Sequence, residues 1–336
     1  MKKLGFGLMR LPLLDPEDER SIDVETVKKM ADAFFSAGFT YFDTAACYHD
    51  GQSEIAFREA VAKRYPRDAY TITDKLTMFM LETEEDMPGF FAGQLERLGV
   101  DFIDYYWLHG LDPNAYPKAQ ELHAFDFVRR LKEEGKVKHI GFSFHGDAKM
   151  LEEILTRYPY LEYVQIQLNY LDWEDPKVQS RLCYETAARH GKPVIVMEPV
   201  KGGCLASIPK EAEKLLREHQ PDQSTASWAV RFAASPENIM VVLSGMSDEA
   251  QMADNISYMK DFRPVSREEI TVLEQVRKII QESIAIPCTG CRYCTEGCPQ
   301  HIAIPDYFAF CNDLHRFGPS QMRNVRRRFR QLAERN

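Results

Sequence analysis

The chain has 336 residues, of which 44% are hydrophobic and 28% charged, and its formal net charge at pH 7 is −9. This length can hold one large domain and a small one, and the composition is ordinary for a soluble globular protein. The acidic balance argues against a nucleic-acid surface over the body of the protein, and no apolar run approaches the ~20 residues that span a bilayer.

Short apolar runs rich in β-formers alternate with segments of helical periodicity up to about residue 257. Several of these runs are continuously apolar, as parallel strands covered on both faces are. Repeated strand–helix units in series predict a closed (β/α)8 TIM barrel. A doubly wound sheet would need a glycine-rich turn after the first strand, and Gly5-Phe6-Gly7 lies inside a strand without the third glycine. The eight predicted strands are 4–9, 40–45, 70–76, 102–109, 137–144, 163–169, 194–200 and 239–245.

The segments between and after these strands have the 3.6-residue period of amphipathic helices. Ser53 is expected to cap the second helix, and Ser266 with Glu269 forms a predicted capping box after Pro264. We therefore expect a barrel domain over residues 1–265 and a small, mainly helical domain over 266–336. The predicted helices are 24–37, 53–64, 84–98, 119–134, 148–157, 177–190, 224–234, 248–259 and 266–283.

Four cysteines lie within the segment IPCTGCRYCTEGCP, in the spacing Cys-x2-Cys-x2-Cys-x3-Cys-Pro. This is the bacterial ferredoxin pattern for a cubane 4Fe-4S cluster, whereas structural zinc favours two ligand pairs separated by a longer loop. In two-cluster ferredoxins the fourth cysteine of such a run ligates the other cluster, but no second cysteine run is present here. The fourth ligand is therefore either Cys298 or another cysteine, of which Cys311 is the nearest. The other cysteines are scattered singly, which is typical of a reducing cytoplasm. The predicted ligands are Cys288, Cys291, Cys294 and Cys298.

Polar residues fall at or just beyond the ends of three successive predicted strands. Asp43 ends the second strand, Tyr48 follows it, Lys75 ends the third and His109 ends the fourth. Barrel enzymes carry their chemistry at these strand ends. A lysine ammonium lowers the pKa of a nearby phenol from its ordinary value of ~10, and an aspartate can hold the ammonium in place. With His109 orienting a carbonyl oxygen, the set suits proton donation to a carbonyl as hydride reaches its carbon.

The stretches GFGLMRLP, YFDTAACY, TDKL, DYYWLHG and HIGFSFHG resemble the aldo-keto reductase family, in order, from residue 4 to about 257. The segment IPCTGCRYCTEGCP resembles the bacterial subgroup with a C-terminal ferredoxin-like domain. The resemblance implies a catalytic tetrad of Asp43, Tyr48, Lys75 and His109, with Tyr48 as general acid. It also implies a nicotinamide dinucleotide bound across the barrel top without a Rossmann fold.

The same resemblance implies a set of cofactor-binding positions. Ser143 and Gln167 fall where the family binds the nicotinamide amide, and Asn255 falls where it contacts adenine. Gly245 and Gln251 complete the implied set.

Three positions depart from the family pattern. Phe144 replaces an asparagine, and Met197 replaces the aromatic ring that stacks on the nicotinamide. Gln251 stands where an arginine often binds the 2′-phosphate, which weakens the case for a strong NADPH preference. A flavin therefore remains an alternative to NAD(P)H.

The run Arg326 to Arg328, with Arg330, gives the acidic chain a basic tail. It is either a solvated helix face or a docking surface for an acidic electron carrier such as a ferredoxin or flavodoxin. Three functions remain open. The first is a cytoplasmic reductase acting on a small carbonyl or alcohol, with a cluster that exchanges electrons with a partner. In the second, the cluster of the same enzyme is structural or redox-sensing. The third is a non-enzymatic redox-cofactor sensor.

Overall fold

A computed structural model of the chain describes residues 2–283, 285–286, 288, 293–296, 298–300, 302–318 and 322–333. The chain divides into two compact units. Unit 1 comprises Met1–Pro199 and Val230–Pro264, and unit 2 comprises Val200–Ala229 and Val265–Asn336. One boundary of this division lies where the sequence predicts the second domain to begin. The segment 200–229, which we assigned to the barrel domain, groups with unit 2.

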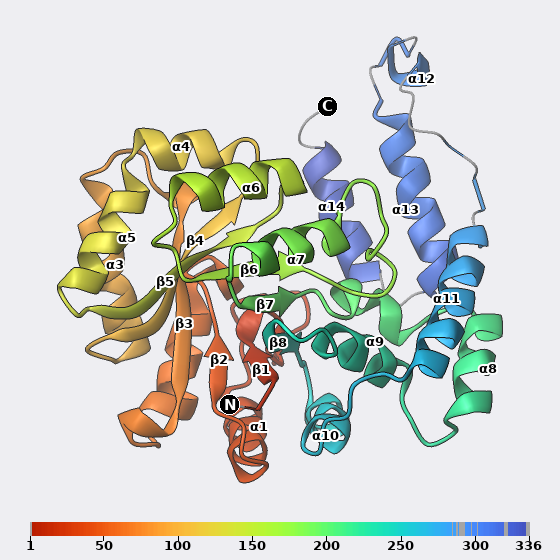
Figure 1. Cartoon of the computed structure of the whole chain (residues 1–336), viewed down its shortest axis with the longest axis horizontal. Helices are drawn as coiled ribbons and strands as arrows, with labels where there is room; N and C mark the ends of the chain where they lie inside the picture. Colours follow the sequence, from red (N-terminus) through yellow and green to blue (C-terminus); the bar gives the residue numbers. More distant parts are fainter. Residues whose placement is uncertain are drawn as a thin grey trace. The chain divides into compact units, whose positions relative to one another are not determined.

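Eight parallel strands form a closed barrel in unit 1, with each strand paired to the next and β8 paired to β1 (Figure 1). The predicted (β/α)8 barrel is confirmed, and the strand boundaries differ from the predicted ones by at most three residues. The pairing register sets Asp43 beside Thr73, Lys75 beside Trp107 and Thr77 beside His109. The strands are β1 (Leu4–Gly7), β2 (Tyr41–Asp43), β3 (Thr71–Thr77), β4 (Ile103–Leu111), β5 (Val137–Phe144), β6 (Tyr163–Gln167), β7 (Val194–Met197) and β8 (Ile239–Gly245).

Helices cover the outside of the barrel, and two of them differ from prediction by more than the position of their ends. The expected helix 119–134 is broken at His123, whose φ of 52° is left-handed. The helix expected at 53–64 begins at Gln52 after Gly51, and Ser53 does not cap it but donates to the Leu8 carbonyl at 3.0 Å. The helices are α1 (Val24–Ser36), α2 (Gln52–Phe57), α3 (Asp86–Leu98), α4 (Ala115–Glu121), α5 (Ala124–Glu133), α6 (Ala148–Arg157), α7 (Ser180–Arg189) and α10 (Glu249–Met259).

Short helical segments lie at the strand ends and loops of unit 1. They are the 3-10 turns η1 (Leu8–Arg10), η4 (Arg67–Ala69) and η5 (Met78–Met80), the segment η2 (Tyr48–Gly51), in which His49 and Asp50 are left-handed, and the π-helical η3 (Arg58–Ala62) that continues α2.

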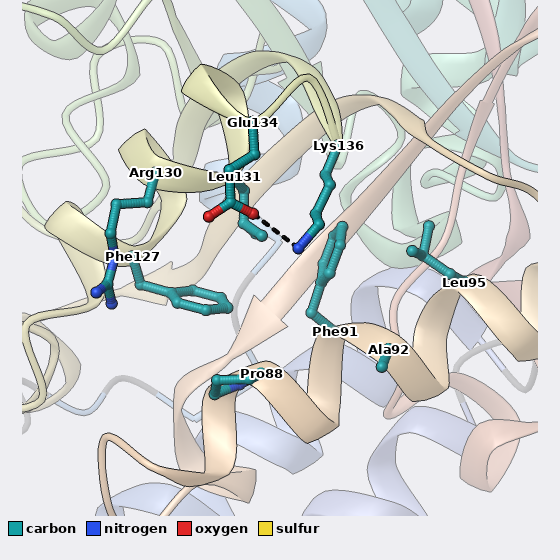
Figure 2. A pocket seen from close by; sticks show the side chains of 9 residues that line it. All are labelled: Pro88, Phe91, Ala92, Leu95, Phe127, Arg130, Leu131, Glu134 and Lys136. Carbon is teal, nitrogen blue, oxygen red and sulfur yellow. Dashed lines mark ion pairs between the residues drawn. The ribbon is translucent and has the colours of Figure 1, made fainter.

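A cavity of about 320 Å³ opens on the outer layer between α3 and α5. Figure 2 shows the rings of Phe91 and Phe127 in this cavity, with an ion pair between Lys136 and Glu134 at its edge (2.7 Å). Its lining comes from residues of α3 and α5 and from Glu134 and Lys136, and includes none of the predicted site residues.

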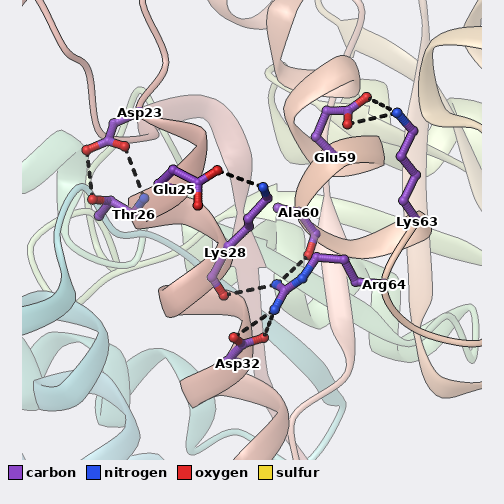
Figure 3. Close-up of polar contacts among 9 residues, drawn as sticks. All are labelled: Asp23, Glu25, Thr26, Lys28, Asp32, Glu59, Ala60, Lys63 and Arg64. Atoms are coloured by element: carbon purple, nitrogen blue, oxygen red, sulfur yellow. Dashed lines mark hydrogen bonds and ion pairs between the residues drawn. The ribbon is translucent and has the colours of Figure 1, made fainter.

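Polar contacts fix the first helix of the barrel (Figure 3). Asp23 caps α1 by accepting from the Thr26 backbone N–H at 3.1 Å. Arg64 donates to both carboxylate oxygens of Asp32 at 2.8 Å and so ties the end of the α2–η3 segment to α1. Both bonds come from Arg64 Nη2, while Nη1 donates to the Ala60 carbonyl at 3.0 Å, so charge-assisted and backbone contacts together fix the arginine.

Large aromatic side chains fill part of the barrel interior. Tyr41, Tyr105 and Trp107 pack with aliphatic residues of β7 and β8 in one buried cluster. Gly141 is required beside them, because a Cβ there would lie 2.6 Å from the Trp107 ring and would collide with the Tyr163 carbonyl. Close packing of this interior leaves the strand ends as the place for chemistry.

The described residues of unit 2 are largely helical. The helix α8 was not predicted from the sequence pattern. Its buried residues are Ala212 and Leu216, and it packs against α11. Gln220, at the end of α8, donates to Glu269 at 2.7 Å. The capping box of Ser266 and Glu269 at the start of α11 is confirmed. The elements are η6 (Lys201–Ala206), α8 (Lys210–His219), α11 (Arg267–Glu282), α12 (Tyr293–Glu296), α13 (Ile304–Phe317) and α14 (Met322–Ala333); α9 (Thr225–Ala234) crosses the division between the units. Among the described residues, no helix has the length and apolar character needed to cross a membrane.

Candidate active site

The predicted acid and amine meet at the carboxyl ends of β2 and β3. Lys75 Nζ donates to Asp43 Oδ1 and to the Thr44 carbonyl, each at 2.6 Å. Both side chains are almost fully buried, with 1% and 4% of their side-chain surface exposed. Burial favours the neutral amine, but the charge of Asp43 and its hydrogen bond to the amine oppose this effect, and the pKa of Lys75 is raised above its ordinary value. The amine is therefore a fixed ammonium.

Tyr48 lies beside this ammonium, on the loop that follows β2. Lys75 Nζ is 4.9 Å from the centre of the phenol ring, and the His109 ring meets it edge-on at 6.1 Å. We expected the lysine to lower the pKa of this phenol below 10. Instead, burial outweighs the lysine and raises the pKa of Tyr48 to about 12. The phenol therefore keeps its proton at neutral pH.

The loop that carries Tyr48 is anchored by the next residue, His49. Its Nε2 accepts from the Leu11 backbone N–H at 3.1 Å, and its Nδ1 lies 2.8 Å from the Glu19 carbonyl oxygen. A ring that accepts at one nitrogen and donates at the other is a neutral imidazole. This arrangement holds His49 at a left-handed φ of 51° and so fixes the backbone beside the phenol.

His109 comes from β4 and completes the predicted four. Burial, with the nearby Lys75 ammonium as a second cause, lowers the pKa of His109 well below its ordinary value, so the ring is neutral. Its Nδ1 lies 3.0 Å from the hydroxyl oxygen of Thr77. When that hydroxyl donates to Nδ1, the proton of the ring sits on Nε2, where it can orient a carbonyl oxygen. Thr77 was not predicted from the sequence. It follows Lys75 by two residues and therefore lies on the same face of β3.

Two of the implied cofactor residues have their polar groups oriented by neighbours. The Ser143 oxygen accepts from the Gly110 N–H at 2.7 Å, so its own hydroxyl proton is available to a ligand. Gln167 Nε2 donates to the buried carboxylate of Asp172 at 3.0 Å, which leaves its amide oxygen as an acceptor. The pair presents one donor and one acceptor, as recognition of a carboxamide requires. Asp172 is a supporting residue that the sequence argument missed.

The remaining implied cofactor residues lie at the end of β8 and on α10. Arg10 packs against Gly245, where an added Cβ would lie 3.3 Å from the arginine Cδ. Gln251 closes the start of α10, accepting from the Ser247 N–H at 2.9 Å and donating to Asp248 at 2.9 Å. Asn255 is 95% buried and its Oδ1 has no hydrogen-bond partner among the described residues. That oxygen is a buried acceptor that a ligand amino group could satisfy.

Cys288 and Cys294 are exposed and Cys298 is half-buried, whereas Cys291 lies outside the described residues. Among the residues that the structure describes, no group of His, Cys, Asp or Glu is arranged to hold a metal ion. The amide of Asn312 on α13 brackets the backbone of Ile286, accepting from its N–H at 2.8 Å and donating to its carbonyl at 2.9 Å. This bracket fixes the chain two residues before Cys288.

Comparison with known proteins identifies the family. An aldo-keto reductase of Strobilurus tenacellus is 27% identical over 332 residues, covering 84% of this chain and 90% of the relative. The NADH-specific methylglyoxal reductase of Escherichia coli strain K12 is 25% identical over 267 residues, covering 72% and 74% of the two chains.

Solved structures show the same fold. The holo form of an aldo-keto reductase from Bacillus halodurans has a TM-score of 0.66 at 23% identity, over 82% of this chain and 91% of that one. An aldo-keto reductase from Klebsiella pneumoniae in complex with NADPH has a TM-score of 0.64 at 17% identity, over 82% and 90%. A model of the aldo/keto reductase family matches residues 3–278, which is most of the chain. The chain therefore belongs to the aldo/keto reductase family of NAD(P)H-dependent oxidoreductases.

Proposed function

We propose that the chain reduces the carbonyl group of a small substrate to an alcohol, with Tyr48 as the general acid. One observation carries the proposal: a buried ammonium, held by Asp43 at 2.6 Å, lies 4.9 Å from the centre of the Tyr48 ring. An ammonium in that place stabilises the phenolate that remains after proton donation. Lys75 thereby favours proton transfer from the phenol, which is protonated before the reaction.

The four side chains divide the work at the carbonyl oxygen. The nicotinamide dinucleotide supplies hydride to the carbonyl carbon when it is bound. Tyr48 gives the phenol proton to the carbonyl oxygen. The carbon thereby gains a C–H bond from the hydride, the oxygen gains an O–H bond, the C=O double bond becomes a C–O single bond, and Tyr48 is left as a phenolate. His109 holds that oxygen through Nε2–H, in the tautomer that donation from Thr77 selects. Asp43 keeps the ammonium charged and in position.

The described residues fit a nicotinamide dinucleotide. The Ser143 hydroxyl can donate to a carboxamide oxygen while the amide oxygen of Gln167 accepts from the carboxamide nitrogen. Asn255 Oδ1, which has no hydrogen-bond partner within the described part of the chain, suits the amino group of adenine. Gln251 is occupied at the start of α10 and carries no charge, so we expect no strong preference for the 2′-phosphate of NADPH.

The first experiment compares wild type with Tyr48→Phe in carbonyl reduction. We expect kcat to fall by roughly 10²–10⁴, the share of a general acid, with dinucleotide binding unchanged. Unchanged turnover would contradict the assignment. A thermal-shift panel of NADH, NADPH, FMN and FAD tests the cofactor, because the imide edge of a flavin also presents a donor between acceptors. If only FMN or FAD raises the unfolding temperature, the cofactor is a flavin rather than a nicotinamide dinucleotide.

We also infer that Cys288, Cys291, Cys294 and Cys298 bind one 4Fe-4S cluster. The spacing supports this, and so does the Asn312 bracket, which fixes the start of the cysteine segment. Purified without oxygen, the protein should be brown, with a broad band near ~400 nm that dithionite bleaches. A colourless protein holding zinc would refute the cluster.

The role of the cluster is a separate question with two answers. A hydride carries two electrons and a cluster exchanges one, so a cluster in the reaction path needs an intermediary. We therefore test whether folded Cys291→Ser retains dinucleotide-driven turnover. Retention supports a structural or redox-sensing cluster. Loss of turnover with retained dinucleotide binding supports electron exchange.

We further propose that α14 docks an acidic one-electron carrier such as a ferredoxin or flavodoxin. The helix carries five arginines in a chain of net charge −9, and one of them, Arg328, pairs with Asp313 at 3.1 Å. Phe329 on the same helix is 49% exposed, which supplies an apolar contact beside the charges. Arg327→Glu with Arg330→Glu should slow electron exchange with reduced flavodoxin several-fold at low salt. The control pair, Arg129→Glu with Arg130→Glu on α5, should leave the rate unchanged.

A further inference from the structure

Side chains bond both backbone polar groups of Lys75. β2 ends at Asp43, and the bond from Thr44 N–H to the Thr73 carbonyl (2.9 Å) continues the β2–β3 contact just beyond it. Two residues along, the Lys75 N–H donates to Asp74 Oδ1 at 2.8 Å, and the Lys75 carbonyl accepts from Gln94 Nε2 at 3.0 Å. Both polar groups of this residue are thus satisfied from the helix-facing side of β3.

Gln94 is itself fixed by a second bond. It lies on α3 with no exposed surface, and its amide oxygen accepts from the Tyr106 hydroxyl at 2.5 Å. Tyr106 is fully buried on β4, and its ring meets Phe91 edge-on at 5.1 Å. Because the amide oxygen is committed to the phenol, the amide nitrogen must face the Lys75 carbonyl. The amide therefore has one orientation.

An ion pair with one fully buried partner and one partner that is 33% exposed lies beside it. Arg97 of α3 donates through Nε and Nη2 to Glu54 of α2, whose side chain has no exposed surface. Glu54 in turn raises the pKa of Asp74, which is fully buried, beyond the increase that burial produces. Buried polar layers are costly, and apolar packing would join helix to strand at least as well. Such a layer behind one residue indicates a positioning role.

We propose that Gln94, held by Tyr106, is a positioning residue that sets where the Lys75 ammonium lies relative to the Tyr48 phenol. The inference rests on the proposed role of Tyr48 as general acid. The Lys75 side chain projects from β3 to contacts of 2.6 Å with Asp43 and the Thr44 carbonyl. A shift of its backbone moves the ammonium away from the phenol, and misplacement by ~1 Å can cost roughly 100-fold in rate.

The experiment uses Gln94→Met, which keeps the length of the side chain and removes both hydrogen bonds, and Tyr106→Phe, which removes only the bond to Gln94. We expect kcat to fall about 10–100-fold in Gln94→Met and about 3–10-fold in Tyr106→Phe, with KM unchanged within about twofold. The groups that face the Tyr48 phenol are Lys75, Asp43, Cys47 and His109. Of these groups, we expect only Lys75 to be displaced in the two variants. The Tyr48 phenol then loses part of the positive charge that lowers its pKa, so the alkaline limb of the plot of kcat against pH should move to higher pH.

Tyr41→Phe is the matched control. Its hydroxyl is equally buried and bonds to β3 at Thr73 (2.6 Å), but it does not reach the Lys75 backbone. It should lower the unfolding midpoint as Tyr106→Phe does, yet leave kcat and the alkaline limb in place. Equal loss of kcat in both tyrosine variants overturns the inference, as does wild-type kcat in Gln94→Met. If Tyr48→Phe keeps its turnover, the proposed function fails and this role fails with it.

Discussion

The rim of the barrel and the cysteine segment obtain their chemistry in opposite ways. At the rim, side chains from three strands and a loop, 66 positions apart between Asp43 and His109, meet in a buried cluster with fixed partners. The four cysteines lie within residues 288–298, and both Cys288 and Cys294 are exposed. One region is organised by the fold, whereas the proposed ligands of the other lie close together in sequence, and the cluster that we propose would organise them on binding.

This difference separates the effects of substitution. A change at the rim acts on groups whose neighbours are already in place, so it alters proton transfer or leaves a buried charge unpaired. A change in the cysteine segment should remove a bound cluster and leave the rim as it is. The two regions can therefore be tested independently.

The largest effect is expected at Lys75. Lys75→Met should lower kcat roughly 10²–10⁴-fold, because the phenolate of Tyr48 loses the charge that stabilises it. It should also destabilise the fold by about 3–5 kcal/mol, because Asp43 is left as an uncompensated buried charge.

The pair Asp43→Asn with Lys75→Met serves as its control. It removes the unpaired charge, so it should recover stability while kcat stays low. Steady-state kinetics and denaturant unfolding on the same preparations separate the two effects. A double variant that regains turnover would show that Lys75 acts only on stability.

The rim illustrates how far sequence pattern reaches. Eight strands and the ends of β2, β3 and β4 followed from apolar runs and from the rule that barrel chemistry lies at strand ends. The contacts of Lys75 with Asp43 and Tyr48 were therefore predictable. The direction of the Tyr48 pKa was not, because burial depends on packing that the pattern does not give.

Other parts could not be predicted for identifiable reasons. Gln94 and Tyr106 act on Lys75 from a helix and a strand distant in sequence, and neither belongs to a motif. The break at His123 depends on a left-handed residue inside an otherwise helical pattern. The helix α8, by contrast, has its buried residues Ala212 and Leu216 one turn apart on a single face, so the sequence pattern could have revealed it.

The cysteine segment should respond to substitution with loss of the cluster alone. Cys298→Ser should remove the band near ~400 nm and most of the bound iron, whereas Cys311→Ser should keep both. Cys311 is exposed on α13, next to Asn312, so its loss should not disturb the fold. Iron analysis and absorption on anaerobic protein give the comparison. The reverse result would make Cys311 the fourth ligand.

A smaller effect is expected at Thr77. Thr77→Val keeps the shape of the side chain and removes the hydroxyl that contacts His109 Nδ1. The imidazole then loses its preference for the tautomer with a proton on Nε2, so kcat should fall about 3–10-fold, as expected for loss of one hydrogen bond. Thr77→Ser should restore the wild-type value. A valine variant with full activity would show that His109 is oriented by other contacts.

The last effect concerns stability rather than turnover, and it lies on the opposite face of β3. Burial and the neighbouring Glu54 raise the pKa of Asp74, so its carboxyl keeps a proton in the folded state at a pH where an unfolded aspartate has lost it. Above ~pH 4 the native state then binds one more proton than the unfolded state. The free energy of unfolding therefore falls as pH rises, by up to ~1.4 kcal/mol per pH unit, until the pH reaches the pKa of Asp74 in the folded state. Asp74→Asn removes this titration, so its stability should fall less between pH 5 and 8 than that of the wild type. If the free energies of unfolding of wild type and Asp74→Asn change in parallel with pH, Asp74 is already ionised in the folded state. The pair of Glu54 and Arg97 then accommodates a second negative charge beside Lys75.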